Sequence, residues 1–213
     1  GGLAATGYAG DGEVEDYTIV VYSEPPLLDF GDAPDTVYPT LRVDFGPSHV
    51  VAGPYLGSTV DVESDGQGNA VATGDGRDED GIHFGDLLIA GLSTNIDVTS
   101  SAGGGVLDFF IDFNANGVFG DVPAEVFQTT LSGGTETLQI TVPADAVVGT
   151  TYARFRISSS GDLGPVYWSP DGEVEDYHLL LLPAPATVEF EYFDGVTAPA
   201  LPDGWTMVAE QDP

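Results

Sequence analysis

The sequence predicts an all-β fold, an antiparallel β-sandwich of the jelly-roll or immunoglobulin-like two-sheet kind. Apolar residues alternate with polar ones in several short segments, as in a strand with one buried and one solvated face. Glycine, proline, asparagine and aspartate separate these segments, and helix-like periodicity is scarce. Several short strands divided by turns are typical of a two-sheet sandwich.

One segment shows the alternation clearly. Ala153, Phe155 and Ile157 share one face of an expected strand. Arg154 and Arg156 are therefore expected to point outward and to pair with surface acids. The other expected strands lie at 14–22, 107–113, 138–142 and 174–182, with weaker candidates near 48–52, 58–63, 86–92 and 94–99.

Acidic residues greatly outnumber basic ones. The 213 residues include 35 Asp and Glu against four Arg and no Lys, for a formal net charge of −31. Such a chain repels itself unless cations neutralise it, although acidity alone also keeps a secreted or salt-adapted protein soluble. Because phosphate binding needs clustered Lys and Arg, the composition excludes nucleic acid as a partner and disfavours anionic membranes.

The sequence contains no cysteine, which excludes disulfides and thiolate metal sites and leaves bound ions as cross-links. No apolar run approaches the roughly 18 residues of a membrane span, so direct membrane insertion is not expected. Known catalytic motifs are also missing. His49, His83 and His178 are widely separated and are expected to be structural. The many acids leave paired carboxylates possible, but their abundance does not indicate an enzyme, and none is expected.

A seven-residue repeat indicates how the chain is organised. Asp11-Gly-Glu-Val-Glu-Asp-Tyr17 recurs as Asp171-Gly-Glu-Val-Glu-Asp-Tyr177, and an apolar run follows each copy. Residues 1–22 are therefore expected to be the terminal strand of a preceding repeat and a candidate donor strand for a neighbouring sheet. One module then covers 23–182, and 183–213 form a linker and the beginning of a following domain.

The sharpest acidic motif follows the expected strand at 107–113. It places oxygen side chains at alternate positions and a glycine at the sixth, as a loop that folds around a hard cation requires. The same residues also suit an ordinary turn. The candidate calcium ligands are Asp112, Asn114, Asn116, the Val118 carbonyl and Asp121.

Three further acidic clusters are candidate cation ligands or, alternatively, solvated loops. Each gathers like charges that repel one another without a cation. The repeated motif could also contribute two residues to a site shared with one of them, or could form a polar turn. The candidates are Asp75, Asp78, Glu79 and Asp80; Asp61, Glu63 and Asp65; Asp29, Asp32 and Asp35; and, from the repeat, Glu173 and Asp176.

Six motifs follow one another along the chain: Asp29-Phe-Gly-Asp-Ala-Pro-Asp35, Tyr38-Pro-Thr40, Val60-Asp-Val-Glu-Ser-Asp-Gly66, Asp78-Glu-Asp-Gly81, Ile111-Asp-Phe-Asn114 and Gly172-Glu-Val-Glu-Asp-Tyr177. Their order over residues 28–182 resembles the GEVED domain, a module of very large bacterial and archaeal secreted and cell-surface proteins. The resemblance implies a β-sandwich with calcium-type acidic loops and no defined catalytic role. The chain departs from the family in the loop after Ile111-Asp-Phe-Asn114, where it has Asn116, Gly120 and a later Glu125. Separately, 193–205 resemble the opening of the jelly-roll domains of cleaved adhesins.

The expected function is that of a non-catalytic, calcium-stabilised structural or adhesive module of a large secreted, extracellular surface protein. Its expected partners are neighbouring modules or subunits of the same protein, in tandem repeats or a filament built by strand addition, and a glycan or cell-surface ligand. The alternative is a carbohydrate-binding module of a secreted multidomain hydrolase. The first function predicts ions at strand-end loops, and the second predicts a platform of exposed aromatic side chains.

Overall fold

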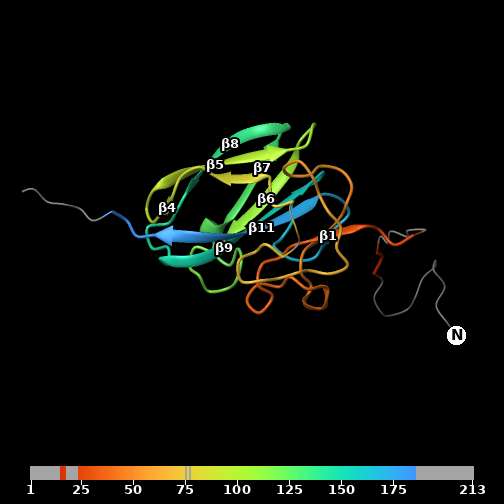
Figure 1. Ribbon diagram of the computed structural model, residues 1–213, viewed down its shortest axis with the longest axis horizontal. Coiled ribbons are helices and arrows are strands. Elements are labelled where there is room, and N and C mark those ends of the chain that lie inside the picture. The colour runs from red at the N-terminus through yellow and green to blue at the C-terminus, as the bar shows by residue number, and fades with distance from the viewer. Residues whose placement is uncertain (1–14, 18–23, 75, 77, 186–213) are drawn as a thin grey trace, which may run out of the picture. The chain divides into compact units, whose positions relative to one another are not determined.

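The structure is a computed structural model that describes residues 15–17, 24–74, 76 and 78–185, and its fold is all-β (Figure 1). The chain divides into two compact units, 1–183 and 184–213, and every described strand belongs to the first. The expectations for 1–22 and 183–213 lie almost entirely outside the described residues. In the described part, the helical elements are two 3-10 turns, η1 (Arg42–Asp44) and η2 (Pro123–Glu125). Neither they nor any other described segment forms a helix suited to span a membrane.

Two main sheets and one small sheet make up the first unit, as Figure 1 shows in part. The five-stranded sheet has the order β4 (Leu88–Ile89), β11 (Glu173–Leu182), β9 (Gly149–Ser158), β6 (Gly105–Ile111), β7 (Val126–Leu131). The three-stranded sheet has the order β3 (Ile82–Phe84), β5 (Ser93–Ser100), β8 (Gly134–Thr141). The small sheet has the order β1 (Leu28–Phe30), β2 (Ser48–Val50), β10 (Trp168–Ser169).

The main hydrophobic core joins side chains of the two larger sheets, as in a β-sandwich. Ile96 and Val98 of β5 belong to the same buried cluster as Phe155 of β9. The Phe109 ring of β6 stacks on Phe155 at 5.0 Å and on Phe127 of β7 at 4.6 Å between centroids. Burial of these apolar faces fixes the strand register, because a shift by one residue would turn each of them toward the opposite side.

Arg154 and Arg156 do not point outward; they are 0% and 1% exposed, which contradicts the sequence-based expectation. They lie on the face of β9 opposite the core, and that face is covered too. Arg154 donates to the carbonyl of Pro39, and Arg156 donates to those of Gly164 and Val166, at 2.6 to 2.9 Å. Irregular segments therefore supply the acceptors. Alternation predicts that a strand has two faces, but it does not reveal what covers the second one.

The first half of β11 lies at an edge of the five-stranded sheet, because β4 pairs only with Leu181 and Leu182. Carboxylates take the place of a neighbouring strand there. The amide of Val174 donates to Asp29 Oδ2 at 2.7 Å, and the amide of Asp176 donates to Glu79 Oε1 at 3.3 Å. The sequence 58–63, expected as a weak strand, is irregular and follows an isolated bridge at Leu56. It brings further acids toward this edge.

Candidate metal site

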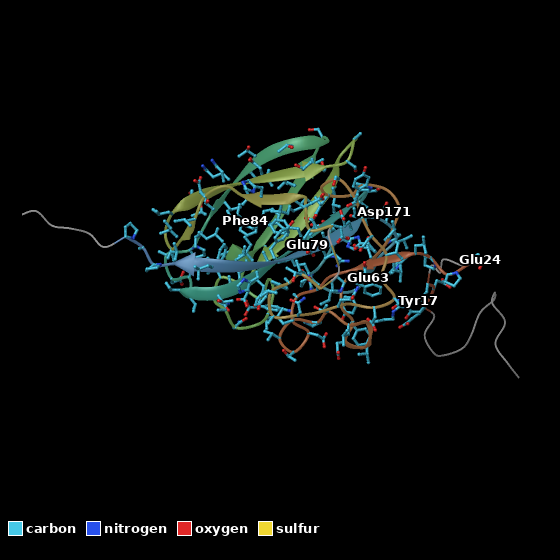
Figure 2. The ribbon with its side chains drawn as sticks, in the orientation of Figure 1. Tyr17, Glu24, Glu63, Glu79, Phe84 and Asp171 are labelled. Atoms are coloured by element: carbon cyan, nitrogen blue, oxygen red, sulfur yellow. The ribbon has the colours of Figure 1, made fainter. Side chains whose placement is uncertain are left out.

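Acids from four separate segments meet beside β1 and the start of β11. We call this set, Asp29, Asp61, Glu63, Asp78 and Glu173, the acidic cluster. One carboxylate oxygen from each of Asp29, Asp61 and Glu63 lies within 4.8 Å of the others. In Figure 2, Glu63 lies in the loop region beside β1 and Glu79 lies near the first half of β11. Asp61 is exposed, whereas the other four acids of the cluster are buried, so solvent reaches the cluster from one side.

Backbone amides hold four of these carboxylates by one oxygen each. Such a bond fixes the orientation of the side chain. The bonds run from Phe30 N to Glu63 Oε2 (3.1 Å), from Asp61 N to Asp78 Oδ2 (3.2 Å), from Leu56 N to Glu173 Oε2, and from Val174 N to Asp29 Oδ2 (2.7 Å).

The second oxygens of three cluster members are buried and receive no hydrogen bond from the described residues. They are Oε1 of Glu63, Oδ1 of Asp78 and Oε1 of Glu173. A buried carboxylate oxygen without a donor destabilises a fold by about 1–3 kcal/mol or more. A proton on the carboxyl or a bound cation would satisfy such an oxygen.

The electrostatics of the cluster agree with its geometry. Burial, then the side chain and charge of Asp61, raise the pKa of Glu63 to about 9. Burial, then the charges of Glu175 and Asp29, raise the pKa of Glu173 to about 11. Burial and the charge of Asp61 also raise the pKa of Asp78 to about 6. Without a cation, these carboxyls share a buried space with like charges, and Glu63 and Glu173 hold protons near neutral pH.

These side chains fit a hard divalent cation. Calcium takes six to eight oxygen ligands, commonly carboxylates and carbonyls, at about 2.3–2.6 Å. The acidic cluster offers five carboxylates and contains neither sulfur nor imidazole. The buried guanidinium groups are bound elsewhere, since Arg154 pairs with Asp176 and Arg156 donates to His49 and to carbonyls. A calcium-type ion would satisfy the oxygens that lack donors and lower the raised pKa values.

The structure brings together residues from four separate predicted sets: Asp29, Asp61 with Glu63, Asp78 and Glu173. It does not bring Asp176 to the same place. Glu173 and Asp176 lie on opposite faces of β11, because side chains alternate along a strand. Glu173 joins the acidic cluster, whereas Asp176 binds Arg154 at 2.7 Å.

Several other predicted ligands hold loops by accepting backbone amides. Asp35 accepts from Thr40 and Leu41, and Asp65 accepts from Arg42 and Gly66. Asp80 accepts from the amide and hydroxyl of Ser58. Asp32 accepts from the amide of Gly74, Glu79 accepts from that of Asp176, and Asp75 lies outside the described residues.

The predicted calcium loop folds back on itself after β6. Asp112 accepts from the amides of Asn116 at 3.2 Å and Gly117 at 2.8 Å. Gly117 adopts the left-handed conformation with φ of 83°, as the sharp turn at the sixth position requires. Asp121 accepts from the side-chain amides of Asn114 at 3.1 Å and Asn116 at 2.7 Å, and the Val118 residue is half exposed. Hydrogen bonds thus link Asp112, Asn114, Asn116 and Asp121 within the loop, whereas the position of the Val118 carbonyl as a ligand stays a prediction.

His49 is a buried structural residue. Its Nδ1 lies 2.8 Å from the carbonyl of Asp171, and its Nε2 accepts from Arg156 Nε at 3.0 Å. Burial and the charge of Arg156 hold the pKa of His49 well below its usual value. The imidazole is therefore neutral, with Nδ1 carrying the proton, and it has no position open for a metal or substrate.

These features define a class of protein: an all-β sandwich domain whose loops bring buried carboxylates to the strand ends. Residues 106–180, from β6 to β11, match the family model of the GEVED domain, which confirms the resemblance over this part of the chain. The match includes Glu173 and the loop that begins at Asp112, whereas the other members of the acidic cluster precede it. No curated protein and no solved structure matches the chain.

Proposed function

We propose that the chain is a non-catalytic structural module of a large extracellular surface protein and that calcium, held by the acidic cluster, stabilises its sandwich. The observation that carries this proposal is the set of buried oxygens without donors on Glu63, Asp78 and Glu173. Raised pKa values mark the same carboxyls. Ligands of one cation share this combination of burial, mutual repulsion and missing donors.

The proposed ion acts as a cross-link in a chain that has no cysteine. It joins β1 and the loop at residues 61–63 to residue 78 and the first residue of β11. It holds these segments together in the folded state, a role that disulfides have in small extracellular domains. Binding only to the folded state stabilises it by about 2.7 kcal/mol when calcium is present at 100 times its Kd.

We propose the same extracellular setting for the location and the partners of the chain. Neighbouring modules or copies of this protein are the proposed partners, in a tandem or filamentous array outside the cell. The acid-rich composition supports it, because a surface module meets millimolar calcium outside the cell and tolerates a high negative charge there. The seven-residue repeat at 11–17 and 171–177 supports a tandem arrangement.

Thermal unfolding tests the proposal. The chelator-treated chain is expected to melt several degrees lower than the chain in excess calcium, because ligands that bind the folded state raise Tm. Calcium must restore the Tm, and magnesium at the same concentration must restore much less, because it requires smaller, near-octahedral sites. An unchanged Tm on calcium removal would reject the cation cross-link.

A carbohydrate-binding module remains the second candidate, because three aromatic side chains are exposed close to one another. Phe45 and Tyr167 are 66% and 63% exposed, their rings are 5.9 Å apart, and Trp168 follows at 43%. Sugar rings stack on such faces. Titration with soluble oligosaccharides while tryptophan fluorescence is recorded tests this function. Saturable binding that Tyr167→Ala abolishes would favour it over a purely structural module.

A further inference from the structure

Glu125 is a buried acid that the sequence-based ligand set does not include. It ends the short turn η2, four residues after Asp121, and it is 0% exposed. Its Oε1 accepts from the amides of Phe113 at 3.0 Å and Asn114 at 3.1 Å. Its Oε2 is buried, and none of the described residues donates to it. The side chain is thus tied by one oxygen to the start of the predicted calcium loop.

The surroundings of Glu125 are acidic. Burial, together with the charge of Asp112 and the side chain and charge of Asp121, raises its pKa to about 7, and the Asn114 amide acts in the opposite direction. Asp112 is itself fully buried and accepts from the hydroxyl of Tyr38 at 2.7 Å. Asp112 and Asp121 are therefore near enough for their charges to act on Glu125. Like charges at such a place repel one another unless a proton or a cation lies between them.

We propose that Glu125 completes a second binding site for a calcium-type divalent cation, with Asp112, Asn114, Asn116 and Asp121 as the other side-chain ligands. An ordinary turn explains the hydrogen bonds within the loop. It does not explain why Glu125, four residues after Asp121, is buried against the loop with an oxygen that lacks a donor. The side-chain amides of Asn114 and Asn116 can rotate to present oxygen in place of nitrogen. Their hydrogen bonds to Asp121 show that they reach its carboxylate.

This site is separate from the acidic cluster. In the five-stranded sheet, Glu173 pairs with Ile157, and Ile157 pairs with Leu107 near the start of β6. Asp112 follows Ile111 at the other end of β6. Five residues of strand between Leu107 and Asp112 span about 16 Å. The two sites are therefore expected to bind cations independently. A failure of the calcium cross-link proposed above would not reject the second site.

Calcium titration calorimetry on the chelator-treated full chain tests the proposal. Wild type is expected to bind two ions. Glu125→Gln should lose one of them, and Glu63→Gln should lose the other, since losing a ligand or its support typically costs about 10–100-fold in metal affinity. Glu136→Gln is the control, because Glu136 accepts a backbone amide, from Ser132 at 2.6 Å, and is not a ligand of either proposed site. Unchanged stoichiometry and affinity in Glu125→Gln would overturn the second site, even if Glu63→Gln shows the first.

Two further measurements keep the test decisive if Glu125→Gln fails to fold. Asp121 is exposed, so Asp121→Asn should leave the fold intact and still weaken the same binding step. Terbium, a calcium-sized luminescent ion, should emit when tyrosine is excited, because Tyr38 contacts Asp112. Tyr38→Phe should reduce that emission, and Asp121→Asn should weaken terbium binding. Full-strength emission and binding in both variants would contradict the site.

Discussion

Asp176 accepts two hydrogen bonds from the guanidinium of Arg154, from Nε at 2.7 Å and from Nη2 at 2.8 Å, and both residues are fully buried. The two face each other across β11 and β9 in the strand register. Asp176 Oδ2 also accepts the amides of Asp32 and Ala33 at 2.9 and 2.8 Å. The pair therefore fixes the segment after β1 onto the outer face of the sheet.

Asp176→Asn is expected to destabilise the fold by about 3–5 kcal/mol, because it leaves the Arg154 charge buried without its partner. Urea unfolding in saturating calcium measures the change in free energy and separates it from any effect on the cation sites. Asp86→Asn, at an exposed position, should change stability by less than about 0.5 kcal/mol. A small loss in Asp176→Asn would mean that water or backbone groups compensate the guanidinium.

Glu63→Gln should remove most of the calcium-dependent rise in Tm while leaving the calcium-free protein about as stable as wild type near neutral pH. The substitution removes a cation ligand, and without the cation it replaces a carboxyl that already holds a proton, because its pKa is about 9. The amide group can keep an oxygen toward Phe30 N. Differential scanning calorimetry with and without calcium measures both effects.

Glu175→Gln is the matched control for that experiment. Glu175 is also buried, and burial raises its pKa to about 8, yet both of its oxygens have donors: the amides of Gly81 and Asp80 and the hydroxyl of Tyr177. Its calcium response should therefore stay close to that of wild type. An equal loss of the calcium-dependent rise in Tm in Glu63→Gln and Glu175→Gln would show that calcium acts on the overall negative charge and not through a defined set of ligands.

Calcium and pH should act on stability in opposite ways. The carboxyls of Glu63 and Glu173 have pKa values of about 9 and 11 in the folded state, well above the ordinary glutamate value of about 4.3. Between the unfolded and folded pKa values, the folded chain binds more protons, so the calcium-free protein loses stability as pH rises. Calcium displaces those protons, and its stabilising effect should grow with pH.

Melting curves at about pH 5.5 and about pH 8, with and without calcium, check this prediction. The calcium-free protein should melt at the lower temperature at the higher pH, and added calcium should raise the Tm more at that pH. A calcium-free protein that becomes more stable toward pH 8 would show that these acids are ionised in the folded state without a cation.

The strand pattern was readable from the sequence because burial imposes period two on β6, β9 and β11. The acidic cluster was not readable as one site. Asp29, Glu63 and Glu173 are far apart in the chain, and only the packing of irregular segments against the edge of β11 brings them together. The same packing buries Arg154, which alternation placed at the surface. The alternation of apolar and polar residues predicts which side chains share a face of a strand. It does not predict which irregular segments pack against that face.

Tyr167 has a backbone strain that a pair of substitutions can measure. Its φ is 73°, in the left-handed region that a bulky side chain rarely adopts, and its amide donates to the carbonyl of Phe45, whose φ is 60°. Because both Tyr167→Gly and Tyr167→Ala remove the ring, the difference between them isolates the backbone. Glycine should be the more stable by about 1–2 kcal/mol, the cost of the left-handed conformation for an L-residue.

At the adjacent residue, Trp168, the alanine variant should be more stable than the glycine variant. Trp168 belongs to β10, where glycine is expected to be less stable than alanine by about 0.5–1 kcal/mol, because its unfolded chain has more freedom to lose. Urea unfolding of the four variants gives the two differences. If the sign reverses as expected, the fold holds Tyr167 in a strained conformation that keeps its ring exposed, and strain of this kind is typical of positions with a binding role. Equal differences at both positions would remove the strain argument for the aromatic surface and leave the exposed rings without functional support.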